Sequence, residues 1–320
     1  MNKLSKDSAL RQPIGEEAAG QRIDNYLMRQ LKGVPKSHVY RILRSGEVRV
    51  NSRRIGPDYR LQPGDLLRIP PVRTAQKPEI RGLPKGGFQP AILFEDEALL
   101  VIDKPSGLAV HGGSGLSFGV IEALRQARPD SKFLELVHRI DRETSGVLML
   151  AKKRTALVDL HRQLQAGEVE KRYRALVKGL WTERKRVVDL PLEKRVRSSG
   201  DRRVNVGAAG DQAVTIFRLE RRVGPYSLLD AELKTGRTHQ IRVHLAHLGY
   251  PILGDDKYGD FTLNKSLAKQ GLKRMFLHSW RVAVRHPLSR EKVVFEAPLP
   301  EELRGFIEMT GKTKKHAPTL

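Results

Sequence analysis

Residues 134–151 read LELVHRIDRETSGVLMLA, and this stretch is the most informative part of the chain for the fold. Apolar residues dominate positions 134–138 and form a continuous run over 147–151, and polar residues separate the two segments. Short apolar runs bounded by polar residues are typical of buried strands. We therefore predict a strand, a polar loop and a second, buried strand. Loops on such a scaffold often carry binding and catalytic side chains.

Strand-like runs and amphipathic helices alternate on both sides of this stretch. Helical spacing of apolar residues predicts helices over residues 118–127 and 154–165. Apolar and β-branched runs predict further strands over residues 92–94, 99–102, 172–177, 214–220, 227–233, 240–244 and 293–296. Strict β-α-β repetition is absent, so the pattern indicates an α+β fold and not a doubly wound sheet.

Residues 20–75 are predicted to form a separate, small α/β module. Apolar residues at helical spacing predict helices over residues 23–31 and 37–46, and two short strand-like pieces follow them. Residues 1–75 carry about twice as many basic as acidic residues, which suits a module that contacts RNA phosphates. Charged helix faces are also common where a helix is merely solvated, so the pattern alone leaves both interpretations open.

The remaining segments divide the chain further. Residues 1–19 are predicted to be a flexible N-terminus, and residues 309–320 a disordered tail. Residues 76–89 are rich in Pro, Gly and basic side chains without an apolar period, so we predict a linker there. Residues 90–308 then form the larger domain.

The charge of the chain is its most unusual bulk property. Lys and Arg number 59 against 36 Asp and Glu, which gives a formal net charge of +23 and a pI near 10.4. Such a surface concentrates polyanions, so nucleic acid is the favoured partner. A generic basic surface, or one suited to an anionic membrane, is the alternative. Self-repulsion at this charge favours a monomer.

Several classes of site and location are excluded or disfavoured by the sequence. Cysteine is absent, which excludes disulfides, cysteine nucleophiles and thiolate metal sites. No phosphate-binding loop, zinc-binding helix or nucleophile elbow is present, so we predict neither a cofactor nor a metal. No apolar run approaches the ~20 residues of a membrane span, and the N-terminus lacks a secretory signal, so we expect a cytoplasmic protein.

Asp141 is the first candidate for chemistry, because it lies in the polar loop of residues 139–146 between Arg139 and Arg142. Neighbouring cations favour the charged form of a carboxylate, which would suit a nucleophile or a base. A structural Asp–Arg ion pair at a strand end has the same pattern, and these residues alone favour that structural interpretation.

The motifs around Asp141 resemble a known family. HRIDRETSG (138–146) is similar to the first signature of the RluA/RluC branch of pseudouridine synthases, with Ile140 where leucine is more usual. KRYRALV (171–177) and LKTGRTHQIRVH (233–244) resemble the second and third motifs in the same order. Residues 21–70 are similar to the RNA-binding module named after ribosomal protein S-four. The resemblance implies a mixed, mainly antiparallel central sheet flanked by helices and loops.

The resemblance also implies a function. Enzymes of this family isomerise uridine to pseudouridine in RNA, and further stretches resemble the members that act on large-subunit (23S) ribosomal RNA. The expected partner is therefore that RNA or an assembling large ribosomal subunit. A non-catalytic RNA-binding assembly factor on the same fold is the alternative, and a nuclease or glycosylase lacks the paired acids or metal ligands that it would need.

The family motifs assign roles to residues by resemblance. The catalytic set is Asp141, Tyr173 and Arg242, in which the arginine pairs with the aspartate and the tyrosine packs against the target base. Tyr173 as an ordinary core residue of a strand is the alternative. Substrate-binding candidates are His138, Arg139, Arg142, Thr144, Arg237, His239 and Gln240. RNA-binding candidates in the N-terminal module are Lys36, Arg41, Arg44, Arg49, Arg53 and Arg54. Residues 171–174 and 184–186 are expected to add phosphate contacts.

Overall fold

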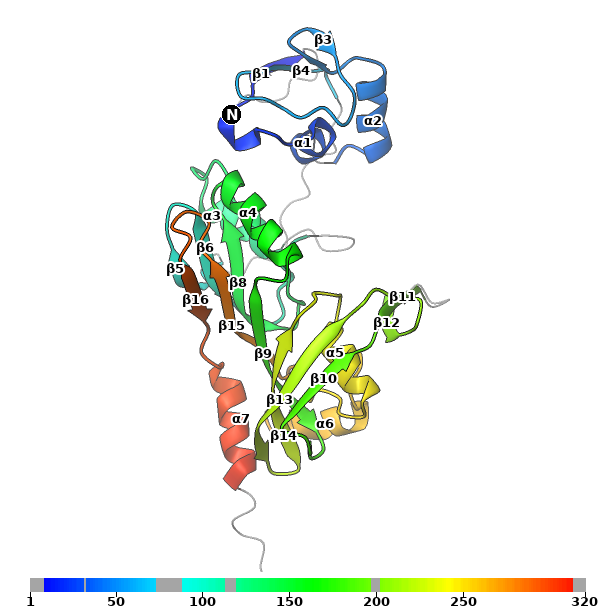
Figure 1. Ribbon diagram of the computed structural model, residues 1–320, viewed down its shortest axis with the longest axis vertical. Coiled ribbons are helices and arrows are strands. Elements are labelled where there is room, and N and C mark those ends of the chain that lie inside the picture. Colours follow the sequence, from blue (N-terminus) through cyan, green and yellow to red (C-terminus); the bar gives the residue numbers. More distant parts are fainter. Residues whose placement is uncertain (1–8, 32, 73–87, 113–118, 197–201, 313–320) are drawn as a thin grey trace, which may run out of the picture. The chain divides into compact units, whose positions relative to one another are not determined.

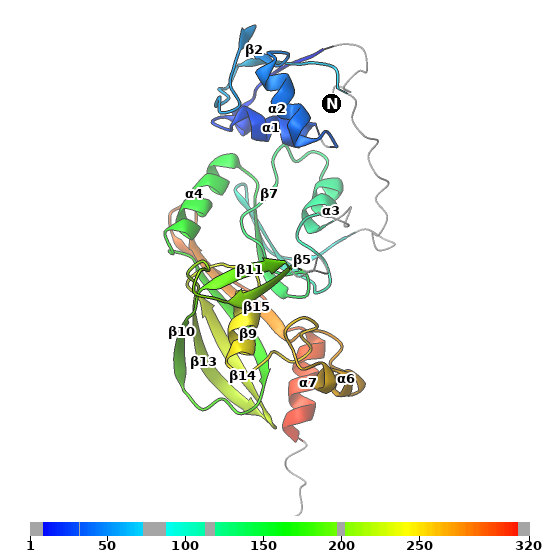
Figure 2. The same cartoon turned by 90° about the vertical axis from the view of Figure 1, so that its right-hand side faces the viewer.

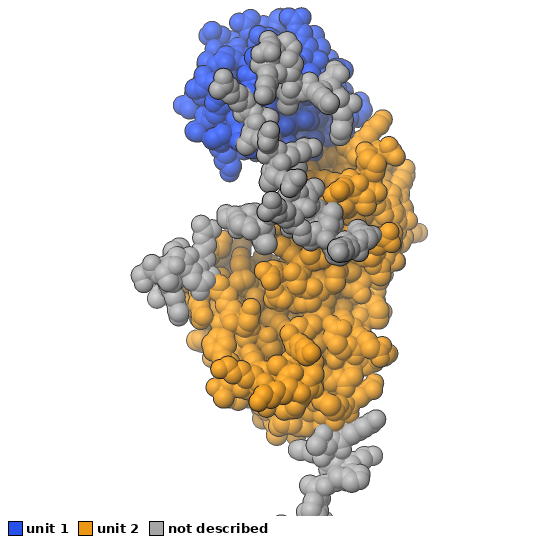
Figure 3. All heavy atoms as spheres, turned by 180° about the vertical axis from the view of Figure 1, so that it is seen from behind, with its two compact units in different colours: residues 1–82 blue, residues 83–320 orange. Residues whose placement is uncertain are grey.

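The computed structural model describes residues 9–31, 33–72, 88–112, 119–196 and 202–312 of the chain. The chain divides into two compact units, Met1–Gly82 and Leu83–Leu320 (Figure 3). The division falls within the predicted linker, of which residues 76–87 lie outside the described residues. Each unit has a hydrophobic core of its own.

The first unit packs two helices against a small sheet. Its elements are β1 (Leu10–Pro13), the 3-10 turn η1 (Glu16–Ala18), α1 (Ile23–Gln30), α2 (Lys36–Arg44), β2 (Arg49–Val50), β3 (Arg53–Arg54) and β4 (Leu66–Ile69). The strands are ordered β1-β4-β2-β3. Both helices are amphipathic and bury one face, with Leu27 of α1 and Ile42 of α2 fully inside the core. Their other faces remain polar, as the sequence predicts.

The N-terminal segment corrects one expectation. Residues 1–19 are predicted to be flexible, but residues 9–19 are part of the folded unit, and residues 1–8 lie outside the described residues. Strand β1 pairs with β4 along its whole length, and Ile14 and Ala18 are buried in the core. The segment is ordered because its few apolar side chains cover the end of that core.

The second unit is built around one large sheet. Its strands are β5 (Ala91–Glu95), β6 (Leu99–Lys104), β7 (Glu135–Leu136), β8 (Ser145–Ala151), β9 (Glu170–Lys178), β10 (Lys185–Asp189), β11 (Leu192–Val196), β12 (Arg202–Val206), β13 (Val214–Val223), β14 (Tyr226–Leu233), β15 (Leu277–Arg285) and β16 (Lys292–Glu296). Its helices are α3 (Val120–Ala127), α4 (Arg154–Gln165), α5 (Gln240–His247), α6 (Phe261–Lys269) and α7 (Glu301–Lys312). Figure 1 shows the arrangement.

The main sheet has the strand order β10-β13-β14-β9-β15-β8-β6-β5, and β16 and β7 pair with β15 and β8. Among the described strand pairs, only β8 and β15 run parallel, and all others are antiparallel. The sheet is therefore mixed and mainly antiparallel. None of the helices within the described ranges combines the length and apolar character needed to cross a bilayer.

The apolar run after the polar loop forms β8, which is buried on both faces. Leu148 and Leu150 point into a core that includes α3, and Val147 and Met149 point into a second core that includes α4. Figures 1 and 2 show α3 and α4 on opposite sides of this part of the sheet. Burial on both faces explains why the run is continuous and does not alternate.

Three neighbouring strands meet where β8 begins. Gly146 of β8 lies beside Ser279 of β15, and Ser279 lies beside Tyr173 of β9. Gly146 has φ +109°, and a Cβ placed there would stand 2.1 Å from the Ser279 carbonyl oxygen. Only glycine permits this backbone conformation and this approach together. The register places the polar loop before β8 next to Tyr173.

Two other elements differ from the sequence-based prediction. Residues 240–244 are predicted to be a strand, but Gln240–His247 is the helix α5. Its alternating Ile241, Val243 and Leu245 mimic strand periodicity because the helix is buried on nearly every side. The predicted tail at 309–320 is helical up to residue 312, since α7 buries Phe306 and Ile307 in the core. Residues 313–320 lie outside the described residues.

We expect Gly146→Ala to lower the free energy of unfolding by roughly 3–5 kcal/mol. The strained φ and the overlap with the Ser279 carbonyl each contribute about 1–3 kcal/mol. Chemical denaturation followed by circular dichroism measures the change.

Gly167→Ala is the matched control, because Gly167 also has a positive φ, +71°, but a Cβ there meets nothing within 4 Å. It should cost only about 1–2 kcal/mol. Equal losses for the two variants would contradict the role of the close approach.

Candidate active site

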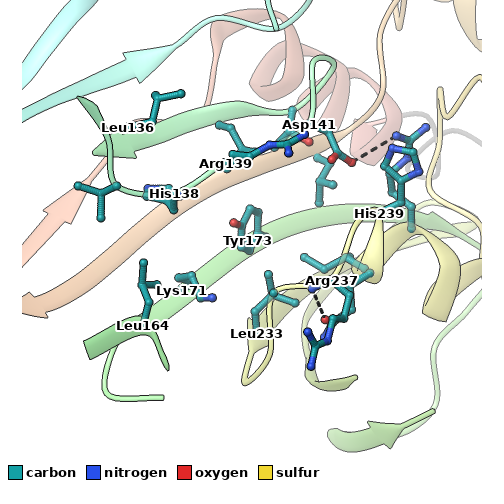
Figure 4. Close-up of a pocket in the computed structure, with 18 of the residues that line it drawn as sticks. Leu136, His138, Arg139, Asp141, Leu164, Lys171, Tyr173, Leu233, Arg237 and His239 are labelled. Atoms are coloured by element: carbon teal, nitrogen blue, oxygen red, sulfur yellow. Dashed lines mark hydrogen bonds and ion pairs between the residues drawn. The ribbon is translucent and has the colours of Figure 1, made fainter. Parts of the chain in front are cut away.

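A pocket of about 650 Å³ opens in the second unit, and all three sequence motifs contribute to it (Figure 4). The loop before β8 supplies Asp141, β9 supplies Tyr173, and helix α5 supplies Arg242. These three residues are more than 30 positions apart along the chain, yet they line one cavity. Of the substrate-binding candidates, His138, Arg139, Thr144, Arg237, His239 and Gln240 also line it.

Asp141 is a partly exposed carboxylate of this pocket. Its side chain is 25% exposed, and its Oδ2 accepts a hydrogen bond of 3.3 Å from Nη1 of Arg242. Two side chains hold the backbone of the loop that carries Asp141. Lys104 Nζ donates to the Arg142 carbonyl at 3.0 Å, and Ser106 Oγ donates to the Glu143 carbonyl at 2.7 Å. The carboxylate is therefore fixed in place but remains accessible from the pocket.

Arg242 is buried and is oriented by an aspartate that sequence analysis did not assign. Its Nε and Nη2 donate to the two carboxylate oxygens of Asp255, each at 2.7 Å. Asp256 lies at 3.4 Å but is 76% exposed, and the ring of Tyr258 lies 5.1 Å from the guanidinium carbon. A bidentate pair of this kind sets the plane of the guanidinium. The third nitrogen then points at Asp141.

Arg242 and Asp255 each stabilise the charged form of the other. Burial opposes ionisation of Asp255, but the hydrogen bonds and the charge of Arg242, with the backbone N–H groups of Tyr258 and Lys257, hold the pKa of its carboxyl below the usual value. Burial likewise opposes the charge of Arg242, yet Asp255 and Asp141 raise the pKa of the guanidinium above its ordinary value. Both groups are charged at neutral pH.

Tyr173 lines the pocket with a ring that is only 5% exposed. Burial, with a smaller contribution from the charge of Asp141, raises the pKa of its phenol above the ordinary value. The hydroxyl is therefore protonated at neutral pH. In Figure 4 the side chain points into the space between Asp141 and Lys171.

Two of the histidines that line the pocket, His138 and His239, are neutral at physiological pH. Burial and the charge of Lys171 lower the pKa of His138 to about 3, and its Nε2 accepts a hydrogen bond of 3.2 Å from the Met149 amide. Burial also lowers the pKa of His239, whose Nδ1 lies 2.8 Å from the Tyr258 hydroxyl. Neither histidine adds a fixed positive charge to the pocket.

Gln240 organises the segment before α5. Its Oε1 accepts from Thr235 Oγ1 at 2.8 Å and from the Arg237 amide at 3.0 Å. Its Nε2 donates to the Val214 carbonyl at 3.0 Å and to Thr215 Oγ1 at 2.9 Å. All the hydrogen-bonding capacity of the amide is used inside the protein. The geometry gives Gln240 a positioning role and does not leave it free to bind a substrate.

Some expected residues are not brought to the pocket. Arg142 does not line it, because its side chain is 59% exposed and pairs with Glu143 at 3.0 Å. The cluster at residues 171–174 is divided by strand alternation: Lys171 and Tyr173 face the pocket, whereas Arg172 pairs with the buried Asp230 and Arg174 with Glu220. The cluster therefore does not act as one phosphate-binding patch.

Other pocket residues were missed from the sequence. His161, Leu164 and Gln165 line the pocket from the C-terminal half of α4, and His161 Nε2 contacts the Val137 carbonyl at 3.1 Å. Nothing local in α4 distinguishes them from an ordinary helix face. Within the described residues, no group of three potential ligands is arranged to hold a metal ion.

The RNA-binding candidates all belong to the first unit and are exposed there. Arg41 pairs with Glu47 at 3.1 Å. A hollow of about 470 Å³ in this unit is lined by Arg49 and by two arginines that the sequence did not single out, Arg11 and Arg68. Arg11 was missed because β1 was expected to be flexible.

Comparison with known proteins is informative for both units. A family model described as RNA pseudouridylate synthase matches residues 98–247, and one described as S4 domain matches residues 21–67. Curated relatives named ribosomal large subunit pseudouridine synthase C include that of Pasteurella multocida (strain Pm70), 53% identical over 92% of this chain and 91% of the relative. That of Escherichia coli (strain K12) is 51% identical over 92% of this chain and 94% of the relative.

Solved structures show the same likeness. Human RNA pseudouridylate synthase domain containing 4 superimposes with a TM-score of 0.56 at 25% identity, over 69% of this chain and 93% of that one. Human RNA pseudouridylate synthase domain containing 1 gives 0.56 at 22% identity, over 72% and 97%.

We expect Asp255→Ala to lower the free energy of unfolding by about 3–5 kcal/mol, because it leaves the buried Arg242 without its main partner. Asp256→Ala is the matched control: it contacts the same guanidinium from an exposed position and should cost only about 0–1 kcal/mol. Urea denaturation at neutral pH measures both, and similar losses would contradict the assignment.

The Asp255–Arg242 pair should also make the stability of the folded protein depend on pH. The folded-state pKa of Asp255 is depressed, so its contribution to stability is complete above the unfolded-state value of about 3.8. The contribution should disappear as pH falls through the lower folded-state pKa. The stability difference between the wild type and Asp255→Ala should therefore narrow on acidification and stay constant between pH 5 and 7.

Proposed function

Because this chain belongs to the pseudouridine synthase family, we propose that it isomerises specific uridines to pseudouridine in large-subunit (23S) ribosomal RNA. The expected family and the α+β fold class are confirmed. The observation that carries the proposed chemistry is the convergence of Asp141, Tyr173 and Arg242 on one pocket.

The reaction breaks the bond between ribose and a ring nitrogen of uracil and joins the ribose to carbon five of the same base. It involves no net redox change and no transfer to a second molecule. Glycosidases break a comparable bond with two carboxylates, one of which protonates the leaving group. Uracil is a tolerable leaving group, so a single carboxylate is sufficient here.

Asp141 is the proposed catalytic carboxylate. Whether it adds to the ribose or removes a proton from it, its reactive form is the ionised one. Arg242 stabilises that form through the 3.3 Å hydrogen bond, and Asp255 holds Arg242 in orientation. Arginine suits this position because it stays protonated and can fork onto one carboxylate while contacting a second.

Tyr173 is the proposed packing surface for the flipped base. A target uridine must leave its stack to reach Asp141, and an aromatic ring compensates part of the lost stacking. The raised pKa of the phenol disfavours a role as the base that removes the proton from carbon five. Arg139, exposed at the rim of the pocket, is the proposed wedge that fills the space the base has left.

The first unit is the proposed RNA-holding module. Its exposed basic residues lie on α2, on β2 and β3 and around the hollow that Arg11 and Arg68 line. These groups contact phosphates and so position the enzyme without reading bases. We further propose that the protein is a cytoplasmic monomer that meets its RNA either free or in an assembling subunit, because its charge of +23 disfavours self-association.

Asp141→Asn should reduce pseudouridine formation at least about 1,000-fold, because it removes the reacting carboxylate and preserves its shape. RNA affinity should stay equal or increase slightly, since a negative charge disappears beside a polyanion. Cells lacking the gene, rescued with the wild type or the variant, are mapped for pseudouridine in large-subunit RNA.

Asp256→Asn serves as control, since it removes an exposed carboxylate near the same arginine and should restore every site. Sites that return with Asp141→Asn would remove the catalytic role of Asp141. No difference between deleted and rescued cells would favour the non-catalytic assembly factor instead.

Deleting residues 1–82 should weaken RNA binding and flatten its dependence on salt. Each lost phosphate contact reduces the slope of log Kd against log salt by about 0.7–0.9. Replacing only the six predicted basic residues of this unit by Gln in the full chain should reproduce most of the change. Fluorescence anisotropy over a salt series measures the slopes, and an unchanged slope in both proteins would exclude this unit from RNA binding.

A further inference from the structure

Lys171 is a pocket cation that the catalytic scheme does not use. It lies on β9 two positions before Tyr173, so strand alternation places both side chains on the same face. Both residues line the 650 Å³ pocket, and Figure 4 shows the Lys171 side chain near Leu164 and His138, away from Asp141. The amine therefore faces a different part of the cavity from the reacting carboxylate.

No partner for this amine is found in the part of the chain that the structure describes. Its neighbours on the strand differ, because Arg172 donates to Asp230 at 3.0 Å and Arg174 donates to Glu220 at 3.1 Å. The two carboxylates that line the pocket have other partners: Asp141 pairs with Arg242, and Glu135 pairs with Arg125 at 2.8 Å. Among the described residues of this unit, no carboxylate pairs with Lys171.

The amine of Lys171 is largely removed from water, but no side chain of the residue opposite covers it. Burial lowers the pKa of Lys171 below the ordinary value for lysine. A Cβ on Gly236 would stand 3.4 Å from Nζ, so the residue opposite the amine has no side chain to cover it. A desolvated cation without a partner is costly for the folded protein, and proteins seldom bury one unless something pairs with it.

The missing partner is expected to be an anion that the substrate brings. In RNA the anions are the backbone phosphates, whereas the uracil ring carries only neutral carbonyl and N–H groups. Lysine binds phosphate well as a compact point charge with three donors. The nucleotide whose base rests on Tyr173 must pass its backbone through the same cavity. Its backbone then comes close to Lys171, the neighbouring residue on the same face of β9.

We propose that Lys171 binds a backbone phosphate of the RNA strand that carries the target uridine, and so positions the flipped nucleotide against Tyr173 and Asp141. The proposal rests on the proposed function and adds a phosphate subsite to it. Lys171 is a positioning residue in this scheme, because it does not touch the reacting atoms.

The test combines a protein change with an RNA change. A short synthetic RNA that the wild type converts is prepared in versions that each carry one neutral methylphosphonate near the target uridine. For the wild type, one such position should lower kcat/KM about 10- to 100-fold, which is typical of a lost charge-assisted hydrogen bond. Lys171→Met should lower kcat/KM on the unmodified RNA by a similar factor and should lose nothing further at that position.

Two further variants serve as controls. Lys132→Met removes one exposed lysine outside the pocket and should leave kcat/KM and the methylphosphonate profile unchanged. Lys171→Arg keeps the charge and should retain sensitivity at the same linkage. Lys171→Met should also keep or raise the Tm, because it removes a desolvated charge that has no partner in the folded protein.

The outcomes separate the two proposals. If the losses from Lys171→Met and from methylphosphonate multiply at every position, or if no position affects the wild type, the phosphate subsite is overturned. A lower Tm for Lys171→Met with an unchanged kcat/KM would assign it a structural role and also overturns it. If the wild type converts no RNA at all, the proposed function fails, and the subsite falls with it.

Discussion

The close approach of Gly146 to the Ser279 carbonyl is the constraint on which the rest of the second unit depends. It joins β8 to β15 in the parallel pairing of this sheet, and β15 in turn pairs with β9. A side chain at position 146 would push the strands apart and carry the preceding loop with them. Asp141 and Tyr173 would then no longer share a pocket, although neither residue would itself have changed.

The burial of Arg242 is a second constraint on the site, and it determines how the charged groups of the pocket are arranged. Arg242 is costly to bury, and the two short hydrogen bonds that it donates to Asp255 compensate that cost while fixing its orientation. The guanidinium then presents its remaining nitrogen to Asp141, which is the more exposed of the two aspartates. One buried carboxylate therefore serves the structure, so that a second, accessible one is available for chemistry.

Strand alternation separates the ion-paired cations of β9 from the one that faces the pocket. Arg172 and Arg174 lie on the outer face, where acidic partners neutralise them and the ring of Trp280 lies 5.3 and 4.6 Å from their guanidinium carbons. Lys171 and Tyr173 lie on the inner face, where the pocket is. Four consecutive residues thus divide into a layer of ion pairs and a pocket-facing surface. A count of basic residues along the chain does not distinguish the two.

Local patterns alone predict a large part of this protein. The strand–loop–strand around Asp141, the paired helices of the first unit and the α+β class follow from periodicities of two and 3.6 residues. The likeness of three short motifs to a family was enough to name Asp141, Tyr173 and Arg242. These features are readable because each depends on residues that are close in the chain.

Other features depend on contacts between distant residues, and only the tertiary structure decides them. Residues 240–247 form a helix that is buried on nearly all sides, so they lack the one-sided apolar pattern that would identify a helix from the sequence. The pairing of Arg242 with Asp255, the exclusion of Arg142 from the pocket and the isolation of Lys171 follow from which charges the fold brings within a few ångströms. Periodicity in a sequence reports which face of an element is buried, but not what lies against that face.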